Sequence, residues 1–166
     1  MISEIQQYLK NLLLSIGYSE ARIYLRKEDL LNSQDSRQAG CWPYEEELER
    51  ISKRVTYTKD GQKVKRKQVF KRVIKFNIVL GEYKLAEAEA LYIQFLSLID
   101  EYINIDENAV PIRLAKAEWI DKSDEILKAK FAMHLILEFD TGIYKESGYA
   151  ALNDLNIEVR KEENGN

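Results

Sequence analysis

The chain has 166 residues, of which 45% are hydrophobic and 32% are charged, and its net charge is −3 at pH 7, which predicts one domain large enough to bury a core. No apolar run approaches the about 20 residues of a membrane helix, and the first residues lack the basic and apolar regions of a secretion signal, so we expect folding in the cytosol and no membrane partner. The single cysteine, Cys41, excludes an intramolecular disulfide and is consistent with a reducing compartment.

The first predicted elements are a helix and a short strand. Residues 3–16 form the helix, with Ser3 and Gln6 as a capping box and Gly17 as the C-terminal stop. The apolar side chains of this helix share one face: Ile5, Leu9, Leu12, Leu13 and Ile16. Residues 21–26 alternate between apolar and polar side chains, which is the pattern of a half-buried strand.

Residues 28–48 show no sustained periodicity and are rich in Asn, Ser, Asp, Gln, Gly and Pro, so they predict a long loop with aromatic anchors at Trp42 and Tyr44. Loops of this length in a compact domain are usually functional or mobile. Residues 45–49 predict a short helical turn after this loop.

A long β-hairpin is predicted from Val55 to Leu80, with its turn at Asp60-Gly61. The return arm alternates, because successive strand side chains point to opposite faces. One face is apolar: Val64, Phe70, Ile74, Phe76, Ile78 and Leu80. The other face is basic: Lys63, Lys65, Lys67, Lys71 and Lys75. The half nearer the turn is polar on both faces and has no core to pack on, so we expect the tip to project and to meet a partner.

A change to helical periodicity predicts the main helix over residues 83–103. Its apolar face contains Leu85, Ala88, Tyr92, Phe95, Leu96, Ile99 and Ile103. Two strands follow over residues 110–120 and 126–139, joined by a turn at residues 121–124. Phe131, Met133, Leu135, Leu137 and Phe139 make the second a core strand, and residues 140–142 predict an exit turn.

These elements predict an α+β fold. We expect a mostly antiparallel sheet of four to five strands with a long projecting β-hairpin, packed against the N-terminal helix and one main central helix. Residues 1–145 form a single domain in this interpretation. Residues 146–166 are a C-terminal tail, extended or partly ordered by partners.

The sequence offers little from which to build a catalytic site, so we expect a non-enzyme without cofactor or metal. His134, the only histidine, lies within a predicted strand and is interpreted as structural. Cys41 has no second cysteine or clustered histidine nearby, which disfavours zinc. The seven glycines form no dinucleotide or phosphate loop. One acidic cluster lacks the interleaved Asp, Asn and Gly of a calcium loop: Glu45, Glu46, Glu47 and Glu49. A second cluster has the wrong spacing for a nuclease site: Asp121, Asp124, Glu125 and Lys128.

Charge is distributed unevenly along the chain. Residues 59–75 hold one acid, Asp60, and eight basic residues: Lys59, Lys63, Lys65, Arg66, Lys67, Lys71, Arg72 and Lys75. Residues 82–107 hold one base, Lys84, and seven acids: Glu82, Glu87, Glu89, Asp100, Glu101, Asp106 and Glu107. Elements of opposite charge therefore follow one another in the chain.

Three interpretations of the basic hairpin remain open. The hairpin of one subunit could cross onto the acidic helix of the next, a head-to-tail contact that closes into a ring if the rotation permits. It could track nucleic-acid phosphates, although the acidic helix and negative net charge oppose this. It could also be a strand edge that lysines protect from aggregation.

The predicted elements follow the order short N-terminal helix, strand, long charged hairpin, helix and final hairpin, and the final hairpin ends with Leu137-Glu138-Phe139-Asp140-Thr141-Gly142-Ile143-Tyr144. This order resembles that of the tail terminator (tail completion) proteins of tailed bacteriophages and related contractile particles. The resemblance covers roughly residues 1–145. It leaves out the 28–48 loop and the tail after Lys145, and it includes no catalytic motif.

The resemblance implies a structural virion protein that forms a ring, commonly a hexamer. The ring caps the tail tube, ends tube polymerisation and connects to the head or neck. The implied partners are further copies of the chain and the tail tube protein, with sheath and neck or collar proteins as further candidates and DNA only in passage through the channel. The implied location is the host cytoplasm during assembly and then the virion or tail-like particle.

In this interpretation the subunit-interface candidates are Lys63, Lys65, Lys67, Lys71 and Lys75 on the hairpin and Glu82, Glu87 and Glu89 on the helix. The alternatives are another neck or connector protein of the same particle, or a nucleic-acid-binding module that uses the basic hairpin.

Overall fold

The computed structural model describes residues 1–59, 62–106, 108–120 and 131–146, with the backbone alone at residues 57–59, 62–64 and 146. The helices are α1 (Ile2–Ser15), α2 (Lys27–Asn32) and α3 (Leu85–Leu98), and a 3-10 turn, η1, spans Glu20–Arg22. The strands are β1 (Ile23–Tyr24), β2 (Gln38–Lys59), β3 (Gln62–Glu82), β4 (Tyr102–Ile105), β5 (Asn108–Ile120) and β6 (Phe131–Glu146). No helix within these ranges has the length and apolar character needed to cross a bilayer.

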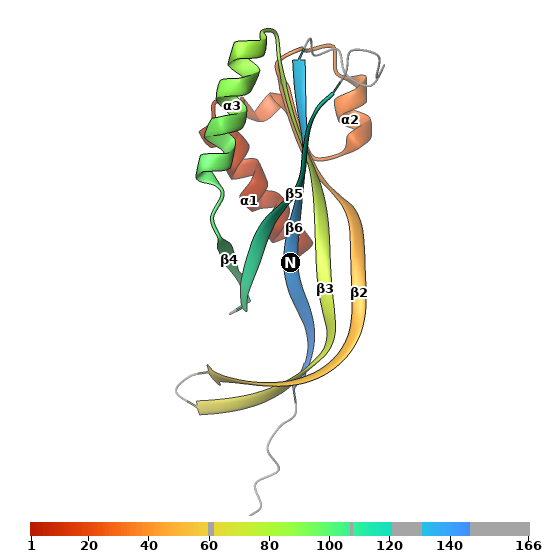
Figure 1. The fold of residues 1–166 in the computed structure, drawn as a ribbon, viewed down its shortest axis with the longest axis vertical. Helices are drawn as coiled ribbons and strands as arrows, with labels where there is room; N and C mark the ends of the chain where they lie inside the picture. The colour runs from red at the N-terminus through yellow and green to blue at the C-terminus, as the bar shows by residue number, and fades with distance from the viewer. Residues whose placement is uncertain (60–61, 107, 121–130, 147–166) are drawn as a thin grey trace, which may run out of the picture.

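The strands form one sheet in the order β1-β2-β3-β6-β5-β4 (Figure 1). β1 pairs with β2 in parallel, whereas the other neighbours are antiparallel. The α+β fold class is therefore confirmed, but the described part of the sheet is mixed and has six strands instead of four to five. The strand that was not predicted is β4, an edge strand of four residues, and periodicity detects so short a strand poorly.

Helices cover both faces of the sheet: α1 and α3 lie on one face and α2 lies on the other (Figure 1). Alternate residues of β3 and β6 point toward α1 and α3, where Phe76 and Phe139 meet edge to face with ring centroids 5.7 Å apart. The core contains the predicted stripe of the first helix and most of the predicted inner faces of the strands: Ile5, Leu9, Leu12, Leu13, Ile16, Ile74, Phe76, Ile78, Leu80, Met133, Leu135, Leu137 and Phe139. Phe70 and Phe131, which were also predicted to lie there, are only partly buried.

The predicted capping box at the start of α1 is wrong, because Met1 is the N-cap and no side chain caps the helix. The Gln6 amide instead donates hydrogen bonds to the carbonyl oxygens of Leu25 (2.9 Å) and Cys41 (3.0 Å), which ties α1 to the chain around β1 and to β2. The predicted C-terminal stop is confirmed, since Gly17 has φ +97°, a left-handed conformation that favours glycine.

The largest correction concerns residues 28–48, where the structure has α2 and the first part of β2 instead of a loop. Ala39 and Cys41 are fully buried, and residues 45–49 continue the strand instead of forming a helical turn. The reason is cross-strand pairing: Arg72 donates two hydrogen bonds to the Glu46 carboxylate, at 2.8 and 2.9 Å. These charge pairs across the ladder override the low strand preference of glutamate.

The predicted hairpin is confirmed and is longer than expected, because β2 and β3 pair from Gln38↔Gly81 to Lys59↔Gln62, with register shifts between Pro43 and Glu45 and between Arg50 and Lys53. The turn at residues 60–61 lies outside the described residues. β6 accompanies β3 as far as Arg66↔Glu146, so among the described residues the hairpin continues beyond this point as a two-stranded ribbon. The ribbon curves away from the body of the domain, as predicted (Figure 1).

Three predicted boundaries are wrong. The strand predicted over residues 21–26 is reduced to β1, after the 3-10 turn η1. The main helix ends at Leu98 instead of residue 103, because the backbone becomes extended at Ile99 and Ile103 belongs to β4. No exit turn occurs at residues 140–142, since Thr141 Oγ1 donates a hydrogen bond to the Arg72 carbonyl (3.0 Å) and β6 continues along β3. The predicted turn at residues 121–124 lies outside the described ranges.

Candidate assembly interface

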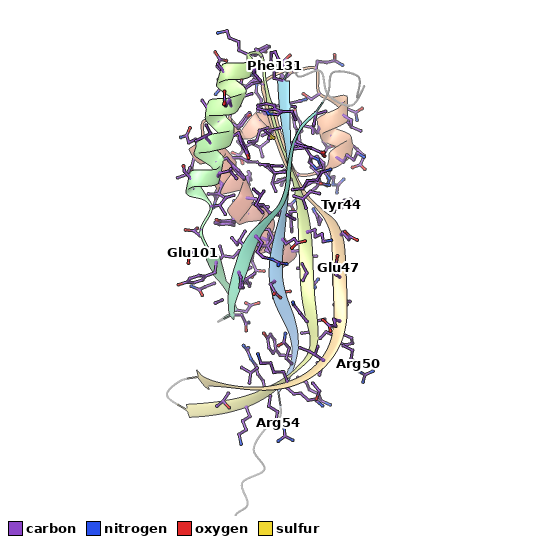
Figure 2. All side chains as sticks on the ribbon, in the orientation of Figure 1. Tyr44, Glu47, Arg50, Arg54, Glu101 and Phe131 are labelled. Atoms are coloured by element: carbon purple, nitrogen blue, oxygen red, sulfur yellow. The ribbon has the colours of Figure 1, made fainter. Side chains whose placement is uncertain are left out.

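We define the basic ribbon as residues 50–59 of β2 and 62–68 of β3. Residues 50–70 of the sequence hold one acid, Asp60, and eight basic residues: Arg50, Lys53, Arg54, Lys59, Lys63, Lys65, Arg66 and Lys67. Figure 2 shows the Arg50 and Arg54 side chains pointing away from the body of the domain. Such a dense cationic surface attracts anionic groups over distances up to the Debye length.

The register of the basic ribbon places like charges opposite each other. Arg54 pairs with Lys67 across the ladder, just beyond irregularities at Arg50/Lys53 and Gln68/Phe70. Like charges directly opposite in an antiparallel pair destabilise it. An anionic partner would relieve this repulsion.

The base of the basic ribbon is held firmly by neighbouring strands. The Arg66 guanidinium stacks on the Tyr144 ring, 3.8 Å from its centroid, and donates a hydrogen bond to Asn108 Oδ1. These contacts connect β3 to β6 and β5. The direction in which the ribbon leaves the domain is therefore set by the fold.

The predicted row of lysines is divided by the structure. Lys65 and Lys67 are exposed on the basic ribbon, whereas Lys71 lies 3.7 Å from Asp140 in the body of the sheet. Lys75 contacts its own sheet's acids: Glu47, Glu45 (3.0 Å) and Glu138 (4.0 Å). The hydrogen bonds that it donates to Glu47 and Glu45 raise the pKa of Lys75. The Lys63 side chain lies outside the described residues.

The three predicted acidic residues also differ in their exposure to solvent. Glu82 is only 1% exposed and pairs with Arg37 Nε at 3.1 Å, so its carboxylate does not reach the surface. Glu87 and Glu89 are exposed on α3, where Glu87 accepts a hydrogen bond from Lys84 Nζ (2.8 Å). Of the three predicted acids, Glu87 and Glu89 therefore remain accessible to another subunit.

Sequence reasoning missed the basic residues of β2 because it began the hairpin at Val55. Arg50, Lys53 and Arg54 lie on the outgoing arm, and their presence makes both arms of the basic ribbon cationic. The available signal was the density of basic residues between positions 50 and 54.

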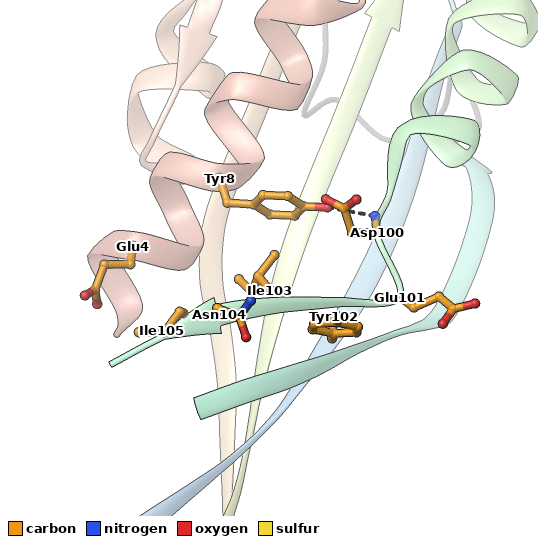
Figure 3. A pocket seen from close by; sticks show the side chains of 8 residues that line it. All are labelled: Glu4, Tyr8, Asp100, Glu101, Tyr102, Ile103, Asn104 and Ile105. Atoms are coloured by element: carbon orange, nitrogen blue, oxygen red, sulfur yellow. Dashed lines mark hydrogen bonds between the residues drawn. The ribbon is translucent and has the colours of Figure 1, made fainter. Parts of the chain in front are cut away.

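An acidic hollow of about 650 Å³ lies between α1 and the edge strand β4 (Figure 3). Its lining includes the carboxylates of Glu4, Asp100 and Glu101, together with Tyr8 and Tyr102. The Tyr8 hydroxyl accepts a hydrogen bond from the Asp100 backbone N–H (3.0 Å), and burial raises the pKa of Tyr8 to about 12. The hollow is formed by residues far apart in sequence, so the sequence alone did not reveal it.

The histidine and the cysteine, which were the candidate catalytic or metal-binding residues, both contact or lie within the sheet. His134 Nδ1 and Nε2 lie 3.1 Å from Glu118 Oε1 and 2.7 Å from Asn77 Oδ1. Cys41 is buried in β2, and burial raises the pKa of its thiol to about 12. Within the described ranges, no three His, Cys, Asp or Glu side chains are grouped to hold a metal ion.

Comparisons with known proteins add no assignment: no protein-family model matches the chain, and no curated protein is significantly similar to it.

Proposed function

We propose that this chain is a structural protein that assembles head to tail into a ring, with the basic ribbon of one copy docked on the acidic hollow of the next. The observation that carries the proposal is the ribbon itself, which extends beyond β6 and holds Arg54 opposite Lys67 without an acid between them. The hollow supports it as an acceptor, because Asp100 and Glu101 line it beside the edge strand β4, whereas its third acid, Glu4, is paired with the Met1 ammonium.

The ring is proposed to act as a tail terminator of a phage tail or tail-like particle. In this role it would cap the tail tube, end tube polymerisation and connect to the head or neck, with hexamer as the order that the resemblance implies. The order of α1, β1, the β2–β3 hairpin, α3 and the β5–β6 pair supports this assignment. A neck or connector protein of the same particle is the alternative within this class.

A second candidate is a nucleic-acid-binding module. It is favoured by the basic residues of both ribbon arms, which could neutralise several phosphates together. It is opposed by the net charge of −3 and by the acidic hollow, which would repel a polyanion.

Reversing the charge of two ribbon residues tests the proposal. Lys65→Glu with Lys67→Glu is expected to weaken self-association about tenfold, because complementary surface charges set partner choice. The fold should be retained, since both residues are exposed and Lys67→Glu replaces a repulsive pair with an attractive one. Sedimentation over a concentration series, with and without isolated tail tubes, measures assembly. Arg26→Glu, an exposed charge reversal outside the ribbon, is the matched control.

Asp100→Lys with Glu101→Lys in the ribbon variant should restore part of the lost assembly. Unchanged assembly of the ribbon variant would contradict the proposal. If the wild type stays monomeric with tubes present but binds a DNA duplex tightly and in a salt-sensitive manner, the nucleic-acid module replaces it.

A further inference from the structure

Helix α3 carries apolar side chains on the face that points away from the sheet. It packs Ala88, Leu91 and Phe95 against the domain, yet Ile93 on the opposite face is 58% exposed and Leu85 at its start is 50% exposed. Surface helices normally present a polar outer face, and several other exposed positions of α3 are polar: Glu87, Glu89, Gln94 and Ser97. Ile93 is therefore an exposed apolar side chain among polar neighbours, and it is the candidate anchor of a contact.

The opposite face of the sheet contains a groove that is also lined by exposed apolar side chains. The groove has a volume of about 590 Å³ and lies between α2 and the strands, with Leu31, Trp42, Tyr44 and Trp119 among its lining residues. Tyr44 is 58% exposed and Trp119 is 45% exposed. Aromatic side chains held open in a groove are the residues that most often dominate binding energy in protein interfaces.

The charges of the groove favour an acidic partner. Its own carboxylate, Glu118, is occupied by Lys116 Nζ (2.7 Å) and His134 Nδ1 (3.1 Å), and these contacts hold the pKa of Glu118 below its usual range. Lys27, which also lines the groove, has no acidic partner among the described residues. A binding segment with an acid next to its apolar anchor would complement this arrangement.

We infer that the outer face of α3 of one copy seats in this aromatic groove of the next copy. Ile93 fills the space among Trp42, Tyr44 and Trp119, and Glu89, one helical turn earlier on the same side of α3, lies toward Lys27. A second copy is the occupant because the chain itself supplies both complementary surfaces, on opposite faces of its sheet, where they cannot meet within one molecule. The inference rests on the proposed head-to-tail assembly, since a contact between two different faces is heterologous and propagates to a ring.

Engineered cysteines test the contact directly. Ala90→Cys lies on the exposed side of α3 and Leu31→Cys lines the groove. Mixing the two single variants under mild oxidation should give a disulfide-linked dimer, and a chain with both changes should give a ladder of higher oligomers. The native Cys41 is buried and does not interfere. Leu14→Cys, at an exposed position of α1, mixed with Leu31→Cys is the matched control and should remain unlinked.

The outcomes separate this inference from the proposed function. If the wild type assembles but the Ala90→Cys and Leu31→Cys variants do not cross-link, the inference is overturned and the ribbon contact stands. Efficient dimer formation by Ala90→Cys alone also overturns it, because α3 would then pack on α3. A wild type that stays monomeric at high concentration and on tubes contradicts both proposals. Ile93→Asp should in addition weaken assembly about tenfold while leaving the monomer folded, since Ile93 is exposed in the monomer.

Discussion

The carboxylate of Glu82 is buried at the end of β3, where Arg37 Nε lies 3.1 Å from Oε1 and the Tyr83 backbone N–H donates a hydrogen bond to Oε2 (3.2 Å). A charge removed from water costs free energy unless a counter-charge remains beside it. Arg37 therefore has a structural role that its position before β2 did not indicate.

Arg37→Met is expected to lower the free energy of unfolding by about 3 kcal/mol, because it leaves the Glu82 carboxylate buried and unpaired. The double variant Arg37→Met with Glu82→Gln should recover a large part of this loss, since no buried charge remains. Urea denaturation measures both values. Arg22→Met, which removes the exposed ion pair with Asp35 (3.5 Å), is the control and should change stability by less than about 0.5 kcal/mol. Equal losses in the two single variants would contradict this account.

At the scale of elements, the β2–β3 hairpin is stabilised by ion pairs whose pH range follows from the pKa shifts. Hydrogen bonds from Arg72 and Lys75 lower the pKa values of Glu46 and Glu47 below the usual 4.5. The stabilisation from these acids is thus present above pH 4.5 and is lost as the pH falls through the lowered values. Lys75 has a raised pKa, so its contribution is complete below its usual 10.5 and is lost only at higher pH.

Lys75→Met is expected to lower the Tm at neutral pH, because Glu45, Glu47 and Glu138 then face one another without a cation. The decrease should shrink as the pH falls from 7 through 4.5, because the Glu47 carboxylate, whose pKa Lys75 lowers in the wild type, becomes protonated in the variant. Lys71→Met, which removes one ion pair at 3.7 Å, should lower the Tm less. Thermal unfolding followed by circular dichroism across this range makes the comparison, and a Tm decrease that does not depend on pH would argue against the ion pairs.

The sequence predicted those elements whose own periodicity is strong. The alternation in β3 and β6 and the apolar stripe of α1 identified the core correctly. The acidic run in β2 was missed because glutamates favour neither a strand nor burial, and their stabilisation comes from β3 across the ladder. The predicted turn at residues 140–142 failed for the same reason, since turn-forming residues there are held extended by pairing with β3.

The candidate site was predictable only in part. The projecting basic arm followed from composition and alternation, since a strand without apolar residues has no core to pack on. The sequence did not show that Lys65 and Lys67 are exposed on the ribbon while Lys75 is bound to acids of its own sheet. This difference depends on which lysines face the glutamates of β2. The acidic hollow joins Tyr8 with Asp100, whose contact requires α1 to pack beside the end of α3.

At the scale of the whole molecule, the domain carries one cationic and one acidic surface. The basic ribbon projects from the sheet, and the acidic hollow lies between α1 and β4 (Figures 1 and 3). The two surfaces are neighbours, because Arg66 at the base of the ribbon donates a hydrogen bond to Asn108, the ladder partner of Ile105 in the hollow. Contacts between unlike charged surfaces of two copies are favoured over symmetric pairing of like charges. The groove and the outer face of α3 add a second pair of unlike surfaces, on opposite faces of the sheet (Figure 1).

The two proposed contacts differ in their response to salt, which provides the last prediction. Raising the ionic strength from about 0.1 M to about 1 M shortens the Debye length from about 10 Å to about 3 Å and should weaken the contact between the basic ribbon and the acidic hollow. The contact of Ile93 with Trp42 and Trp119 is apolar and should persist. Wild-type oligomers are therefore expected to decrease but not to vanish at high salt, whereas Ile93→Asp oligomers should dissociate completely. Sedimentation velocity at matched concentrations measures both, and wild-type assembly that strengthens with salt would rule out an electrostatic role for the ribbon.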